Sequence, residues 1–167
     1  KFDVLEGGVR VPMIMRWPTH VPAGKVYRQM VSSMDIYPTL VGAAGLKMPE
    51  EQHTDGINLL PFINGKKDSK PHDWLCWQNR SWMPKEDGGP VKPRPKVHNS
   101  AIRKGNWKLV RLNEKIASDD PAPPWQLYDL ATDIEERNDV ADQHDDIVRA
   151  LSAQFNRWRS SMHPTVE

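Results

Sequence analysis

The sequence predicts an α+β fold in which a small antiparallel sheet is covered on one face by a C-terminal helix. Strand-like segments rich in apolar and aromatic residues recur through the second half of the chain, with polar turns between them. The helix is predicted over residues 143–161, because apolar residues there are spaced by three and four and line one side. This stripe consists of Val148, Leu151, Phe155, Trp158 and Met162.

Prolines and glycines divide the first half of the chain into short pieces. Residues 9–17, VRVPMIMRW, are apolar and partly β-branched, and we predict a buried strand that ends before Pro18. Because Pro12 has no backbone N–H, it fits a strand only at a sheet edge or at the start of the strand. A short helical turn is expected within residues 53–67.

Residues 32–45, SSMDIYPTLVGAAG, predict a helix of about ten residues. Either Ser32 or Ser33 can cap its start, and Gly45 can end it. The expected apolar face of this helix consists of Ile36, Leu40 and Val41.

Four strand-like segments are expected after residue 72. The first and last are DWLCWQ (residues 73–78) and WQLYDL (residues 125–130). Between them, SAIRKGNWKLVRL (residues 100–112) predicts two strands that meet at a tight turn around Gly105. The polar segment 64–72 is interpreted as the boundary between two parts of the chain, residues 1–63 and 64–167.

Composition excludes several classes of function. The 23 basic and 22 acidic residues leave a net charge of +1, which does not fit a nucleic-acid-binding protein or a polybasic membrane-binding one. No apolar run approaches the roughly 20 residues of a membrane span. Cys76 is the single cysteine, so an internal disulfide is excluded, and we interpret it as a small buried side chain. No two of the six histidines have the spacing of a helical metal-binding pair, and no metal site is predicted.

The motif EGGVRVP, residues 6–12, has two interpretations. Glu6 and Arg10 can pair across the adjacent Gly7 and Gly8, which allow a positive φ or a close backbone approach. The residues alone favour the second interpretation, a structural turn that leads into a strand. Lys1, five positions before Glu6, is on the same grounds an ordinary N-terminal lysine.

Residues 79–98 form a long loop with an excess of positive charge. Such a surface attracts an anionic carbohydrate, although the same charges also keep a proline-rich loop solvated. Trp77 and Trp82, beside this loop, suit stacking on a sugar, but a tryptophan beside a strand is more often part of the core. The candidate substrate-binding residues are Arg80, Arg94, Lys96 and His98, with Lys85 and Lys92 nearby.

Five segments, in this order, resemble the C-terminal third of the arylsulfatase-type sulfatases, in the alkaline-phosphatase superfamily. They are KFDVLEGGVRVPMIMRWP, VSSMDIYPTLVGAAG, DGINLLPFING, AIRKGNWKLV and LYDLATDIEERND, and together they reach across nearly the whole chain. The resemblance implies that residues 1–63 are the closing strand and helix of the large α/β catalytic domain. Residues 64–167 would then be the smaller subdomain, a four-stranded antiparallel sheet with the terminal helix against it.

The resemblance also implies a site and a reaction. Lys1 matches a lysine that binds the sulfate group in sulfatases, and an ammonium is suited to an oxyanion. The family hydrolyses sulfate esters with a formylglycine nucleophile and a calcium ion, both held by residues that this sequence does not contain. We therefore expect the 167-residue chain alone to be inactive and to depend on an N-terminal catalytic domain. The resemblance favours a periplasmic or secreted protein with a sulfated small molecule or carbohydrate as its substrate.

Two alternatives stay open. A sister enzyme of the same superfamily would act on phosphonate or phosphate esters. A non-catalytic module would instead bind a glycan or a partner chain.

Overall fold

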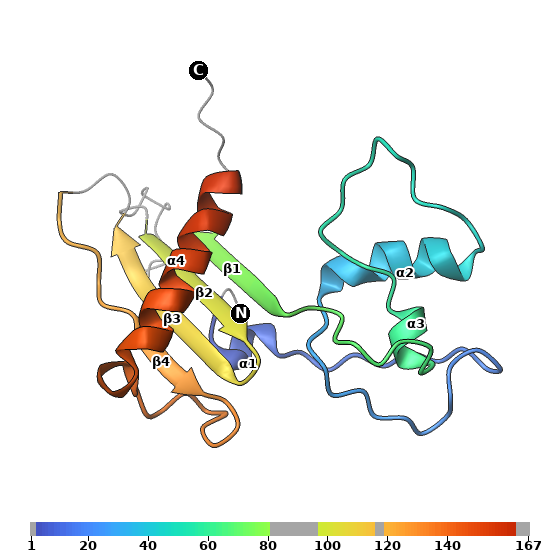
Figure 1. Cartoon of the computed structure of the whole chain (residues 1–167), viewed down its shortest axis with the longest axis horizontal. Coiled ribbons are helices and arrows are strands. Elements are labelled where there is room, and N and C mark those ends of the chain that lie inside the picture. Colours follow the sequence, from blue (N-terminus) through green and yellow to red (C-terminus); the bar gives the residue numbers. More distant parts are fainter. Residues whose placement is uncertain (1–2, 81–96, 116–118, 163–167) are drawn as a thin grey trace, which may run out of the picture. The chain divides into compact units, whose positions relative to one another are not determined.

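The computed structural model describes residues 3–80, 97–115 and 119–162, which form two compact units (Figure 1). One unit joins the residues up to Val11 with those from Trp74 onward, and the other spans Pro12–Asp73. This division differs from the boundary at residues 63 and 64 that the sequence suggests. The difference arises because the beginning of the chain packs on the sheet rather than with the segment that follows it.

The first unit is built on a four-stranded antiparallel sheet in the order β1-β2-β3-β4, as predicted. Its strands are β1 (Trp74–Arg80), β2 (Val97–Lys104), β3 (Trp107–Lys115) and β4 (Gln126–Asp129). In the central register, Cys76 opposes Ile102, Ile102 opposes Leu109, and Leu109 opposes Leu127. The tight turn between β2 and β3 contains Gly105 at a φ of +61°, a conformation that favours glycine.

Helix α4 (Asp145–Met162) covers one face of this sheet, as its apolar stripe predicted (Figure 1). Leu151 and Phe155 are buried against Ile102, Leu109 and Leu127. These three strand residues occupy one face because residues directly opposite each other on neighbouring strands project to the same side of the sheet. A single 3-10 turn, η2 (Ala141–Gln143), leads into the helix.

Cys76 lies partly buried in this same core between sheet and helix. Burial raises the pKa of its thiol to about 12, so the thiolate is scarce at neutral pH. Because the thiolate is the reactive form, this raised pKa lowers the reactivity of Cys76, in agreement with its interpretation as a structural side chain.

The opposite face of the sheet is covered by the N-terminal segment, an arrangement that the sequence did not predict. Val4 is buried there against Ala101, Val110 and Tyr128. Helix α1 (Glu6–Val9) follows it directly. The sheet is therefore covered on both faces, and the segment that covers the second face carries the Glu-Gly-Gly motif.

The predicted buried strand over residues 9–17 is wrong for the described structure. Its first residue ends helix α1, and the segment beyond it is not a strand. Val11 is 73% exposed and Ile14 is 94% exposed. A strand needs a neighbour for its backbone N–H and C=O groups, and no strand is found in the described unit Pro12–Asp73 to supply one.

The second unit contains η1 (Ser33–Asp35), α2 (Ile36–Ala43) and the short α3 (Leu60–Ile63). The predicted helix start and end are confirmed. Ser32 forms a capping box with Asp35, and Gly45 follows the helix at a φ of +72°. The short helical turn expected within residues 53–67 is α3.

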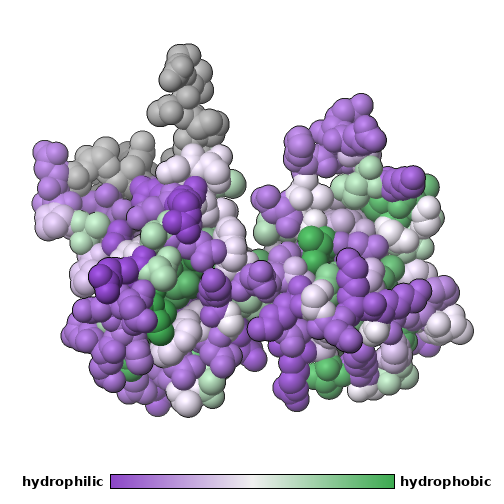
Figure 2. All heavy atoms as spheres, viewed as in Figure 1, coloured by the Kyte–Doolittle hydropathy of each residue, from purple (hydrophilic) through white to green (hydrophobic). Residues whose placement is uncertain are grey.

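The predicted apolar face of α2 is wrong. Ile36 and Leu40 are exposed, whereas Pro38 and Thr39 are buried. The Thr39 hydroxyl accepts a hydrogen bond from the Leu59 amide at 2.9 Å, and this contact turns the opposite side of the helix inward. On the face shown in Figure 2, both units are mainly hydrophilic, and apolar residues are scattered among the hydrophilic ones. Within the described ranges, no helix has the length and apolar character needed to cross a bilayer.

Asp35 holds the second unit together. Its carboxylate is fully buried and accepts hydrogen bonds from the Ser32 amide at 2.7 Å and the Ile57 amide at 2.9 Å. The His72 Nε2 atom lies 2.9 Å from both carboxylate oxygens. The Asp35 side chain thus joins the start of α2 to Ile57 and His72, which lie 22 and 37 positions further along the chain. A buried carboxylate is tolerated here because its partners satisfy it.

Candidate functional site

The Glu-Gly-Gly-Val segment folds as the single turn of helix α1, and Glu6 points into the protein with only 5% exposure. The turn is closed by the Gly8 amide, which donates to the Leu5 carbonyl at 2.8 Å. Gly8 has a packing reason, since a Cβ there would lie 2.4 Å from the Asp3 carbonyl oxygen. At Gly7, a Cβ would meet nothing within 4 Å, so no steric conflict requires a glycine at that position.

Lys108 on strand β3 is the partner of Glu6, and its side chain is completely buried. Its Nζ lies 2.9 Å from Glu6 Oε1 and 2.9 Å from Glu136 Oε1. The ammonium also lies 5.9 Å from the centre of the Trp77 ring, within reach of a cation–π interaction. Strand alternation places Lys108 on the same face of the sheet as Val110, beneath the N-terminal segment.

Glu136 completes the cluster from the turn after β4. Its second oxygen, Oε2, accepts a hydrogen bond from the Glu6 amide at 2.5 Å. Glu136 adopts a φ of +55°, an unusual conformation for a side-chain-bearing residue. The Asp133 carboxylate supports it by accepting from the amides of Arg137 at 3.1 Å and Asn138 at 2.8 Å.

Two arginines border the cluster. Arg10 pairs with Glu6 at 3.3 Å, which is the pairing that the spacing of the motif allows, and Arg103 pairs with the same oxygen at 3.4 Å. Three cations thus face two carboxylates. Nearby Tyr128 is affected as well: burial raises its pKa, and the negative charges of Asp139, Glu136 and Asp133 raise it further.

In this arrangement, the Glu6 cluster (Glu6, Arg10, Arg103, Lys108 and Glu136), every charged side chain lies within 3.4 Å of an opposite charge, so its chemistry is that of an anchor. Removing one partner would leave a buried charge without compensation, which is costly. Among the residues that the structure describes, no group of three or more His, Cys, Asp or Glu side chains is placed to hold a metal ion.

The other candidate residues are only partly described. Lys1, Arg94 and Lys96 lie outside the described residues, as do Lys85 and Lys92. Arg80 ends β1 and opposes His98, which begins β2 and is partly exposed. The structure therefore brings the positions of Arg80 and His98 together at one end of the first two strands.

Lys108 and Glu136 were not recognised from the sequence. A signal for Lys108 is present, however. In NWKLV, strand alternation gives position 108 the same face as Val110, so a lysine occupies a position expected to be apolar. Glu136 carries no comparable signal, because its role depends on a turn that approaches Glu6 from 130 positions away.

The comparison with known families extends over nearly the whole chain. Residues 1–161 match the family described as N-sulphoglucosamine sulphohydrolase, C-terminal. The sheet with its packed helix thus corresponds to the C-terminal part of sulfatases, which belong to the alkaline-phosphatase superfamily. The chain belongs to this N-sulphoglucosamine sulphohydrolase C-terminal family.

Curated relatives agree with this family. Human arylsulfatase D is 37% identical over 170 aligned positions, covering 96% of this chain and 28% of the relative. The N-acetylgalactosamine-6-O-sulfatase of Bacteroides thetaiotaomicron is 30% identical over 161 positions, covering 91% of this chain and 28% of the relative. The chain spans less than a third of the length of these relatives.

Solved structures share the fold. Ps i-CgsB in complex with k-i-k-neocarrahexaose is 30% identical with a TM-score of 0.61, over 85% of this chain and 27% of that one. The phosphonate monoester hydrolase of Agrobacterium radiobacter is 25% identical with a TM-score of 0.58, over 83% of this chain and 27% of that one.

Proposed function

We propose that the full protein carrying this chain is a sulfatase that hydrolyses sulfate esters and that Lys1 binds the sulfate group. The observation that carries this proposal is the match of residues 1–161 to a sulfohydrolase family, in a chain that has the Lys1 and Glu-Gly-Gly spacing. A formylglycine and a calcium ion, held by residues outside this sequence, would supply the nucleophile and further positive charge.

The contribution of this chain would be one positioned ammonium. Lys1 precedes Asp3 by two positions, so their Cα atoms can be at most about 7 Å apart. The chain just beyond is anchored, since Val4 is buried in the core and Glu6 is held by Lys108 and Glu136. A short tether from an anchored point restricts where the ammonium can go, and preorganised charge is what stabilises a developing anion.

The substrate that fits best is a sulfated carbohydrate. One relative is an N-acetylgalactosamine-6-O-sulfatase, and one neighbour was solved in complex with k-i-k-neocarrahexaose. The cationic residues between positions 79 and 98 would favour such an anionic chain over a neutral one.

The alternative function is phosphonate ester hydrolysis, for which the similar Agrobacterium enzyme is named, but the family match and the curated relatives favour a sulfatase. The two are separated by assaying the full protein on an aryl sulfate and on the matched aryl phosphonate ester. We expect a higher kcat/KM for the sulfate ester. A preference for the phosphonate ester would replace the sulfatase proposal with the second function.

The cationic loop leads to a separate prediction. Replacing Arg80, which ends β1, together with Arg94 and Lys96 by glutamine should raise KM for a sulfated oligosaccharide, because the segment 79–98 would lose three attractive charges. A small aryl sulfate, which does not extend to the loop, should be hydrolysed as before. Steady-state kinetics on both substrates measure this, with Lys25→Gln as a control. An unchanged KM for the oligosaccharide would mean that these charges only solvate the loop.

A further inference from the structure

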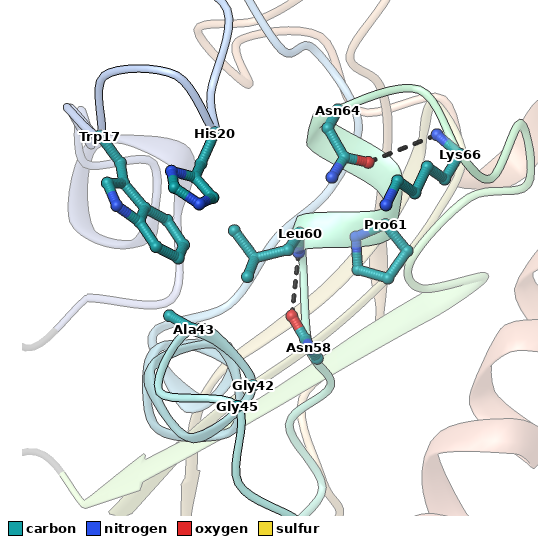
Figure 3. Close-up of a pocket in the computed structure, with 10 residues that line it drawn as sticks. All are labelled: Trp17, His20, Gly42, Ala43, Gly45, Asn58, Leu60, Pro61, Asn64 and Lys66. Carbon is teal, nitrogen blue, oxygen red and sulfur yellow. Dashed lines mark hydrogen bonds between the residues drawn. The ribbon is translucent and has the colours of Figure 1, made fainter.

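The pocket in the unit Pro12–Asp73 has a volume of about 300 Å³, and its side chains are engaged in packing (Figure 3). The Trp17 and His20 rings stack with centroids 4.1 Å apart, so the imidazole covers one face of the indole. The Asn58 NH₂ group packs so closely on Gly42 that a Cβ would not fit there. These contacts explain the pocket within its own unit, and they select no particular ligand.

Glu136, in the other unit, has a backbone conformation that its local sequence does not explain. Its φ of +55° lies in the left-handed region, where glycine and asparagine are the favoured residues. Asp133 builds the turn: its carbonyl accepts from the Glu136 amide at 3.3 Å, and its carboxylate accepts from the next two amides. The turn therefore does not require a glutamate side chain. Such an unfavourable conformation is typical of residues whose side chain has a functional role.

The Glu136 side chain caps helix α1 from a distant part of the chain. Leu5, at the N-cap position, has no side chain that can accept a hydrogen bond, and the Glu6 amide donates to Glu136 Oε2 instead, at 2.5 Å. Compensation of the Lys108 charge does not require this contact, because Lys108 also has Glu6 as a partner at 2.9 Å. What Glu136 supplies beyond its ion pair is thus a fixed position for the backbone at Glu6.

We propose that Glu136 is a positioning residue for Lys1, and this inference rests on the proposed function of Lys1 in binding sulfate. Val4, buried in the core, and the Glu6 amide, held by Glu136, are two fixed points of the N-terminal segment. One fixed point leaves the direction of a chain free, whereas two set the direction in which the segment continues toward Lys1. A misplacement of about 1 Å in a catalytic group can lower the rate by roughly 10²-fold. The turn after β4 would thereby control a catalytic group at the opposite end of the chain.

The test replaces Glu136 by glycine or by asparagine in the full protein. Both residues suit the left-handed conformation, and Lys108 keeps Glu6 as its partner, so the fold should be retained. We expect either variant to lower kcat/KM for an aryl sulfate about tenfold, because Lys1 loses its fixed approach to the sulfate group. Glu135→Gly, at the exposed carboxylate one position earlier, is the matched control and should leave kcat/KM unchanged.

The decisive comparison repeats Glu136→Gly in a protein that carries Lys1→Ala. If Glu136 acts through Lys1, its replacement should lower kcat/KM by less than about twofold once the ammonium is absent, since effects on one shared interaction do not add. A general loss of folded protein would instead give the same decrease in both backgrounds. Leu151→Ala is the reference for such a structural change, because Leu151 is buried under helix α4 on the other face of the sheet. Its effect should be equal with and without Lys1.

Hydrogen exchange measured by mass spectrometry reports on the anchoring itself, without any turnover. Peptides that cover residues 3–10 should exchange faster in Glu136→Gly than in the wild type, while peptides from β2 and β3 should exchange as before. An unchanged kcat/KM in both Glu136 variants, an equal decrease in both backgrounds, or unchanged exchange over residues 3–10 would each overturn the proposal. Full activity of Lys1→Ala would refute the proposed function, and with it the positioning of Lys1, while faster exchange would still identify Glu136 as the anchor of the N-terminal segment.

Discussion

Replacing Lys108 by methionine is expected to lower the free energy of unfolding of the full protein by about 3–5 kcal/mol. Lys108 is completely buried, and its ammonium lies 2.9 Å from an oxygen of Glu6 and 2.9 Å from an oxygen of Glu136. Methionine fills a similar volume but leaves the buried Glu136 carboxylate without its cation and leaves Glu6 paired with Arg10 and Arg103 alone. Urea unfolding followed by tryptophan fluorescence measures the loss.

Two further variants define the origin of this loss. Lys104→Met replaces an exposed lysine of the same hairpin and should change the unfolding free energy by less than about 0.5 kcal/mol. Adding Glu6→Gln and Glu136→Gln to Lys108→Met removes the uncompensated charges and should restore part of the stability. If Lys108→Met alone unfolds like the wild type, the buried ion cluster does not anchor the N-terminal segment.

Replacing Lys1 by alanine in the full protein is expected to lower kcat/KM for an aryl sulfate by roughly 10²–10³, the cost of losing one preorganised donor at a developing anion. The circular dichroism spectrum should stay that of the wild type, since Lys1 is assigned a role in binding sulfate and none in folding. Steady-state kinetics with the purified variant make the measurement.

Lys25→Ala, at another lysine of the chain, is the matched control and should leave kcat/KM unchanged. Turnover by Lys1→Ala within a few-fold of the wild type would contradict the role assigned by the resemblance to sulfatases. The two largest predictions are separable, because Lys108→Met is expected to act first on stability and Lys1→Ala on catalysis alone.

Patterns that repeat along the chain predicted much of the fold. The stripe from Val148 to Phe155 identified helix α4. Its apolar residues repeat every three or four positions, close to the helical period of 3.6, and this pattern is visible within a short stretch of sequence. Gly105 identified the β2–β3 turn, and the pair Ser32 and Ser33 identified the start of the helical segment around α2. In each case the physical cause lies within a few residues of the element itself.

Patterns that depend on distant partners were misread. Residues 9–17 have the composition of a buried strand, yet composition does not tell whether a neighbouring strand is available, and Ile14 is exposed. The face of α2 was misassigned for a related reason. The buried Thr39 is turned inward by a hydrogen bond from the amide of Leu59, 20 positions away.

The sequence by itself determined the antiparallel sheet, the helix that covers it and, through the order of five motifs, the resemblance to sulfatases. Only the tertiary structure showed that the N-terminal segment covers the second face of the sheet and that Glu6, Lys108 and Glu136 share one buried cluster. Glu6 and Lys108 are 102 positions apart, and no local pattern specifies such a pairing. A charge can be buried only where an opposite charge meets it, and the folded chain alone decides where that occurs.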